Sequence, residues 1–157
     1  MIASPALTER AIDRAFLTAL LLTGSAERAE DAVIEALDLW DEEEEHDELM
    51  YAAARAAVAS KSESKKLAGE ELESAMLLVP AELRGVLRLS SELRQCFVLR
   101  ILLGLSTRAC ARALELHVRQ VDRRTAAAME KVSSLQQSIG RTARAASGFL
   151  LRVVQEA

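Results

Sequence analysis

Basic and amide side chains recur at helical spacing within residues 104–131. With Val118 and Val121 turned inward, the set that faces outward is His117, Arg119, Gln120, Arg123 and Arg124. Arginine makes paired hydrogen bonds to guanine, glutamine does so to adenine, and further arginines bind phosphates. Arg108 and Arg112, just upstream, are suited to that phosphate contact. His117 is a lone histidine, which we interpret as a polar residue at a helix start rather than a metal ligand. The chemistry that this stretch offers is nucleic-acid binding.

The elements that must position these groups have the pattern of a helix-turn-helix. Such a motif needs a small residue in its first helix, a turn residue, and a branched apolar residue in its second helix. Ala111, Glu115 and Val121 occupy these places, and Glu115 stands where glycine is usual, at a cost of about 1 kcal/mol. Ser106 caps the first helix, whose expected inner residues are Ala109, Cys110, Ala113 and Leu114. The second helix begins near His117, with expected inner residues Val118, Val121, Thr125, Ala128, Met129 and Val132.

A second interpretation of the same residues stays open. A basic face is also typical of the solvated surface of an ordinary helix bundle, and Asp122 beside Arg123 favours that alternative.

Charge is distributed unequally along the chain. The formal net charge of −4 combines residues 1–80, with 7 Lys/Arg and 18 Asp/Glu (−11), and residues 81–157, with 13 and 6 (+7). Only the second half is therefore expected to attract a polyanion.

Composition predicts an all-α protein. Half of the 157 residues are hydrophobic, only 3% are aromatic, and proline occurs twice, so helix formers dominate. We expect a first helical domain at 1–60, a polar linker at 61–75, a helix-turn-helix domain at 76–132, and an amphipathic helix at 133–157.

Within the first domain, the apolar spacing predicts helices from Thr8 to Thr23, from Ser25, as a cap, to Trp40, and from Leu49 to Ser60. The acidic run 41–48 between the last two reads as a solvated loop or a frayed helix end. In the second domain, short helices are expected at 81–89 and from Ser90 or Ser91 to Gly104.

Several classes of function are disfavoured. The two histidines lie far apart, and the chain has no glycine-rich phosphate loop and no nucleophile beside a base, so we expect neither an enzyme nor a metal or cofactor site. Cys96 and Cys110 fall at apolar helical positions and are expected to be buried, reduced thiols. Without a membrane-spanning run or a leader sequence, the expected location is the cytoplasm.

Two segments resemble the extracytoplasmic-function sigma factors of bacterial RNA polymerase, which belong to the sigma-70 superfamily. Residues 19–40, ALLLTGSAERAEDAVIEALDLW, are similar to region two of that family. Residues 92–132 are similar to region four, with Arg94, the run 98–100, the run 104–106, Ala111 and Val121 on pattern. The two segments occur in the family's order and are separated by a linker, as in the family.

The resemblance implies partners and roles. The first domain would bind the polymerase core through the helix 29–39, with Asp31, Val33, Ile34 and Glu35 at matching positions. The second would read promoter DNA upstream of the start with Arg119, Gln120, Arg123 and Arg124. An anti-sigma protein is a further partner that the resemblance allows, whereas no cofactor is implied.

The chain also departs from the family. Promoter opening needs aromatic and basic residues, but after Trp40 this sequence offers the acidic run 41–48 and then only Tyr51 and Arg55. The tail after Val132 also exceeds what region four needs. An alternative function is therefore a sigma-derived interaction or regulatory module that has lost promoter melting.

Overall fold

The computed structural model describes residues 5–41, 45–60 and 69–138. Every secondary-structure element within these ranges is helical, which confirms the all-α prediction. Contacts between Cα atoms divide the described chain into two compact units, with the division between Ala75 and Met76.

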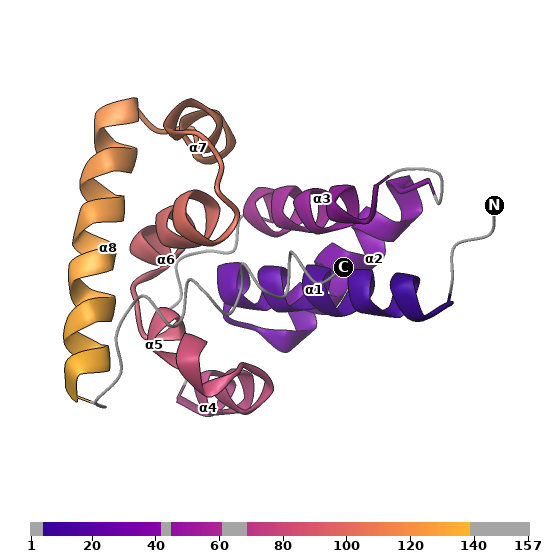
Figure 1. The fold of residues 1–157 in the computed structure, drawn as a ribbon, viewed down its shortest axis with the longest axis horizontal. Coiled ribbons are helices and arrows are strands. Elements are labelled where there is room, and N and C mark those ends of the chain that lie inside the picture. The colour runs from indigo at the N-terminus through magenta and orange to yellow at the C-terminus, as the bar shows by residue number, and fades with distance from the viewer. Residues whose placement is uncertain (1–4, 42–44, 61–68, 139–157) are drawn as a thin grey trace. The chain divides into compact units, whose positions relative to one another are not determined.

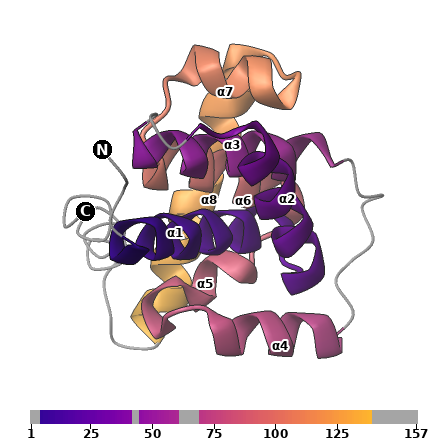
Figure 2. The same cartoon turned by 90° about the vertical axis from the view of Figure 1, so that its right-hand side faces the viewer.

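The first unit is a group of three helices in mutual contact, α1 (Pro5–Thr23), α2 (Ala26–Leu39) and α3 (His46–Ala59) (Figures 1 and 2). Small side chains form much of its core, which lets the helices approach closely. The alanines of this core are Ala11, Ala15, Ala19, Ala29, Ala32, Ala36, Ala53, Ala54 and Ala57. Leu20, Leu49 and Met50 add bulk, each at most 2% exposed.

The predicted boundary between α1 and α2 is confirmed. Gly24 adopts a left-handed φ of 68°, which ends α1. The Ser25 hydroxyl accepts a hydrogen bond from the backbone N–H of Arg28 at 3.4 Å, as an N-cap should. The hydroxyl of Thr23 donates back to the carbonyl of Ala19 at 2.8 Å and so ties down the end of α1.

The prediction that the third helix starts at Leu49 was wrong by three residues. α3 begins at His46, so Asp47 and Glu48 lie in its first turn, where the helix dipole stabilises negative charge. Asp47 also pairs with the guanidinium of Arg14, a buried α1 residue with 5% exposure. Asp41 and Glu45 of the acidic run are exposed and outside the helices, and residues 42–44 lie outside the described ranges.

The predicted linker 61–75 is partly helical. α4 (Gly69–Leu78) begins inside it and spans the division between the two units. Glu70 and Glu71 occupy the first turn of α4, where acidic residues are favoured, and Ala75 is buried. Residues 61–68 lie outside the described ranges.

The second unit is built around α8 (Val118–Ser138), the longest helix described, which contacts α5 (Arg84–Leu87), α6 (Ser91–Phe97) and α7 (Thr107–Leu114) (Figure 1). A single 3₁₀ turn, η1 (Ala81–Leu83), precedes α5, so the helix expected at 81–89 is split in two. Arg84 Nε donates to the carbonyl of Met76 at 3.0 Å across this start.

The helix expected up to Gly104 changes its winding before it ends. After α6 the chain widens into a π-helical turn, η2 (Val98–Leu102), in which Leu103 N–H bonds to the Val98 carbonyl at 2.9 Å. Gly104 then ends the element with a φ of 70°. The guanidinium of Arg100 donates a hydrogen bond to the Leu105 carbonyl at 2.6 Å and so holds the segment that follows Gly104.

The amphipathic helix predicted at 133–157 is not a separate element at its start. Residues 133–138 are the last residues of α8, which continues without a break past the buried Val132. The rest of that predicted helix, residues 139–157, lies outside the described ranges.

Candidate nucleic-acid interface

The first helix of the motif, α7, starts as its sequence predicts. Ser106 is the N-cap, and its hydroxyl accepts a hydrogen bond from the backbone N–H of Ala109 at 3.1 Å. Cys110 and Ala111 are buried on the inner face, Ala109 and Leu114 are partly exposed, and Ala113 is exposed, so its predicted inward position was wrong. The inner face of α7 is therefore narrow, centred on two adjacent small residues.

The turn between the two helices is a Schellman motif built on glutamate. Glu115 adopts the left-handed conformation, with φ 54° and ψ 42°. Leu116 N–H bonds to the Ala111 carbonyl at 2.9 Å, and Glu115 N–H bonds to the Arg112 carbonyl at 3.4 Å, the two bonds that define this motif. A side chain in this conformation carries the backbone strain that glycine would avoid. The chain accepts that strain and fixes the direction in which α8 leaves the turn.

The start of α8 is held by a capping box with histidine as the cap. His117 Nδ1 accepts a hydrogen bond from the Arg119 N–H at 3.4 Å. In return, the side-chain oxygen of Gln120 accepts one from the His117 N–H at 3.0 Å. The usual form of this box has serine or threonine at the cap and glutamate or glutamine three residues later. The prediction that His117 is a helix-start residue is thereby confirmed.

One stripe of α8 packs inward. Val121, Thr125, Ala128 and Val132 are at most 7% exposed. Val118 and Met129 were also predicted to face inward but are 38% and 47% exposed. At about 100° per residue both lie at the same edge of the stripe, about 80° and 100° around the helix from Ala128. The periodicity of the sequence identified the buried stripe but wrongly included Val118 and Met129 in it.

Six of the seven residues predicted to bind DNA are exposed in the second unit. They come from the outer side of α7 and from the first turns of α8: Arg108, Arg112, His117, Arg119, Gln120 and Arg123. Five of the six are arginine or histidine. Two acids lie among them in sequence, Glu115, which is exposed in the turn, and Asp122, which accepts a hydrogen bond from the Thr107 hydroxyl of α7 at 3.3 Å. Asp122 is thus engaged between the two helices of the motif.

Arg124 differs from the other six. Its side chain is 26% exposed and lies 3.6 Å from the Glu92 carboxylate of α6. An ion pair with so exposed an acid contributes little stability, about 0 to 1 kcal/mol, but it turns the guanidinium toward the supporting helix. Sequence spacing alone could not find this partner, which is 32 residues away.

The two thiols are buried, as predicted. Cys96 and Cys110 are free cysteines with no exposed surface. Burial raises the pKa of the Cys110 thiol to about 11, and burial also raises the pKa of Cys96 although Arg124 opposes that shift. Both stay protonated near neutral pH and serve as small core residues.

The first unit presents a different surface on α2. Asp31, Ile34 and Glu35 are exposed, with Ile34 at 52%, but Val33 is only 5% exposed and packs inside the unit. Val33 therefore supports the helix and is not part of its outer face. Leu39, which the sequence did not single out, is 79% exposed at the end of α2.

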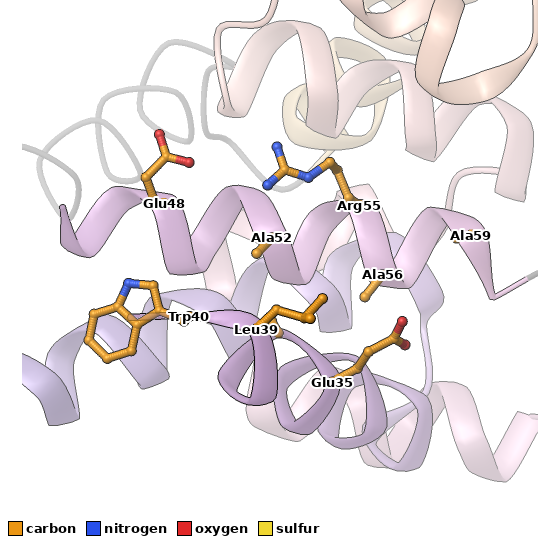
Figure 3. Close-up of a pocket in the computed structure, with 9 residues that line it drawn as sticks. Glu35, Leu39, Trp40, Glu48, Ala52, Arg55, Ala56 and Ala59 are labelled. Atoms are coloured by element: carbon orange, nitrogen blue, oxygen red, sulfur yellow. The ribbon is translucent and has the colours of Figure 1, made fainter. Parts of the chain in front are cut away.

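A shallow groove of about 360 Å³ runs between α2 and α3 of this unit. Its walls are apolar in the middle and charged at the edges (Figure 3). The residues that line it are Glu35, Ala36, Leu39, Trp40, Glu48, Ala52, Arg55, Ala56 and Ala59. The signal that could have found it is the run of alanines on α3 opposite Leu39 and Trp40, since small residues leave space beside large ones.

Among the described residues, no group of three or more His, Cys, Asp or Glu side chains is placed to hold a metal ion. In the same part of the chain, no helix combines the length and the apolar character needed to cross a bilayer.

Comparison with known proteins identifies the second unit. Residues 83–132 match the family model described as Sigma-70, region 4. The match runs from α5 into α8, as far as Val132, and includes the capped turn and the exposed basic residues of α7 and α8 described above. No curated protein and no solved structure matches the chain.

Proposed function

We propose, because residues 83–132 match the family model described as Sigma-70, region 4, that the chain brings the core of RNA polymerase to promoters and recognises their upstream element. Sigma factors of this family are DNA-binding transcription initiation factors without catalytic activity of their own, so in this proposal the chain acts through the polymerase and not as an enzyme. The observation that carries the proposal lies inside the matched region, where α8 begins with a hydrogen-bonded cap and presents exposed basic residues in its first turns.

In this proposal some residues of the second unit contact DNA bases and others contact phosphates. Arg119 and Arg123 lie near the beginning of α8, the end that a helix-turn-helix inserts into the major groove. Arg108 and Arg112 lie on α7, which crosses the DNA backbone in such motifs. Arg124, turned toward Glu92, contributes to the position of α8 more than to base contact.

The first unit supplies the polymerase contact. Ile34 and Leu39 offer exposed apolar area on α2, and Asp31 and Glu35 surround it with negative charge. An apolar centre with a charged rim is typical of a protein interface, and negative charge there selects a basic partner surface. Such a factor acts in the cytoplasm with bacterial RNA polymerase, and an anti-sigma protein could occupy the same face.

A second candidate function has its own supporting observation. Asp41, Glu45 and Glu48 are exposed around the start of α3, where strand opening would need aromatic and basic groups. Tyr51 is half-buried, which leaves Arg55 as the exposed basic residue of that helix. A sigma-derived module that binds polymerase without melting promoters fits these residues.

The DNA contacts are tested with the full-length chain on two duplexes, one enriched from a random library and one scrambled. Arg119→Ala with Arg123→Ala is expected to reduce discrimination between the duplexes about 10- to 100-fold, because base contacts are lost. Arg108→Ala with Arg112→Ala is expected to weaken both duplexes alike and to lower the salt slope by about 2, because two phosphate contacts are lost. Equal affinity of wild type for both duplexes, with and without core polymerase, would refute promoter recognition.

A further inference from the structure

The amide group of Gln120 has a fixed orientation at the start of α8. Its oxygen accepts a hydrogen bond from the backbone N–H of His117 at 3.0 Å. A backbone N–H can only donate, so the amide atom that faces it must be the carbonyl oxygen and not the nitrogen. The capping box therefore sets which end of the amide points to the helix and which end points away from it.

This orientation changes what Gln120 can offer to DNA. The amide nitrogen carries two N–H donors, and the capping box uses neither of them. Gln120 is exposed and lies in the first turn of the recognition helix. While the cap is intact, the end of the side chain that is directed away from the helix donates hydrogen bonds.

We propose that Gln120 is a specificity-determining residue that selects guanine over adenine. Guanine presents two acceptors in the major groove, N7 and O6, which suit a donor. Adenine presents an acceptor beside an amino donor, so its paired contact with glutamine needs the amide oxygen as well. That oxygen would have to leave the His117 N–H, and the start of α8 would lose its cap. The inference rests on the proposed function that α8 reads DNA.

The neighbouring residues support a donor role at this position. Arg119 and Arg123 are exposed on either side of Gln120 along the helix and are themselves donors without acceptors. Asp122, the carboxylate nearest in sequence, is engaged with Thr107. The two arginines beside Gln120 thus present hydrogen-bond donors, and guanine is the base that offers two acceptors to donors in the major groove.

The test compares full-length wild type with Gln120→Glu and Gln120→Ala in selection from a random duplex library. Glutamate at this position keeps the capping box, since it accepts from the His117 N–H as glutamine does, but it removes both amide donors. Alanine removes both the cap and the donors. The melting temperature of each variant separates the two roles: Gln120→Glu is expected to match wild type, and Gln120→Ala to fall below it.

Wild type is expected to enrich a motif with guanine at one position where Gln120→Glu loses about fivefold or more of the preference. Replacing that guanine by 7-deazaguanine, which lacks the N7 acceptor, should weaken wild type by a similar factor and leave Gln120→Glu unchanged. A wild-type preference for adenine or another base at that position overturns the inference, as does a motif unaffected by Gln120→Glu. If wild type enriches no motif at all, the proposed promoter recognition itself fails, and this result differs from a motif that Gln120 does not influence.

Discussion

The two units of this chain are both built from capped helices, but they present different surfaces. In the first unit, alanines let three helices pack closely, and the acidic helix α2 carries the exposed side chains of Ile34 and Leu39. In the second, a left-handed glutamate and a histidine cap aim one long helix that carries arginines. The overall charge of −4 therefore describes neither unit. Acidity belongs to the unit proposed to meet protein, and the basic face belongs to the unit that matches a DNA-binding family.

The strongest way to test this division is to place a buried charge in each core separately. Val121→Asp puts a carboxylate at a position with no exposure, which should cost about 4 kcal/mol or more and unfold the second unit. Ala53→Asp does the same in the first unit. Amide hydrogen exchange resolved by residue would show which helices lose protection.

Each substitution is expected to remove protection mainly within its own unit, α5 to α8 for Val121→Asp and α1 to α3 for Ala53→Asp. Simultaneous loss of protection in both units from either substitution would mean that they form one cooperative structure. Val58→Thr, a mild change at a partly exposed site of α3, serves as the control that should leave both units protected.

A smaller effect is expected at the protein-binding face. Ile34→Asp exchanges exposed apolar area for charge on α2 and should weaken binding to core polymerase about tenfold, with little change in the melting temperature. Leu77→Asp makes the same chemical change at an exposed leucine of α4 and should bind core polymerase as wild type does. The affinity of each labelled variant for core polymerase would be measured by fluorescence anisotropy. If Leu77→Asp lost as much affinity as Ile34→Asp, the α2 face would not be the specific contact.

The smallest effect concerns the strained turn. Glu115→Gly removes the cost of a left-handed side chain and should raise the free energy of unfolding by about 1 kcal/mol. Urea denaturation of the full chain measures this change. Glu115→Ala keeps a side chain at the same φ and should show no such gain. A loss of stability in Glu115→Gly would mean that contacts of the glutamate side chain outweigh the backbone strain.

The sequence predicted those features that depend on neighbours along the chain. Ser25 and Ser106 cap their helices as expected, Gly104 ends its helix, and Glu115 takes the turn position. Each of these signals needs only a few consecutive residues, because capping and turns are local. The confirmed helix-turn-helix frame followed from the same local rules.

What the sequence could not supply depends on partners far along the chain or on geometry within a turn. The earlier start of α3 is accompanied by the pairing of Asp47 with Arg14, which only the folded unit brings together. The contact between Arg124 and Glu92 redirects one of the predicted DNA-binding arginines. The sequence predicted that Gln120 faces outward, and only the folded helix start shows that its amide oxygen accepts a hydrogen bond from the His117 N–H.

Transcription by purified core polymerase would show whether the chain is an initiation factor. Core polymerase would be given sheared genomic DNA from the source organism with and without the full-length chain, and every new RNA start would be mapped. We expect discrete starts that share an upstream motif, and loss of that motif with Arg119→Ala and Arg123→Ala. The absence of new starts, with the same core polymerase active with another sigma factor, would mean that the chain is not an initiation factor and would favour the interaction module without promoter melting.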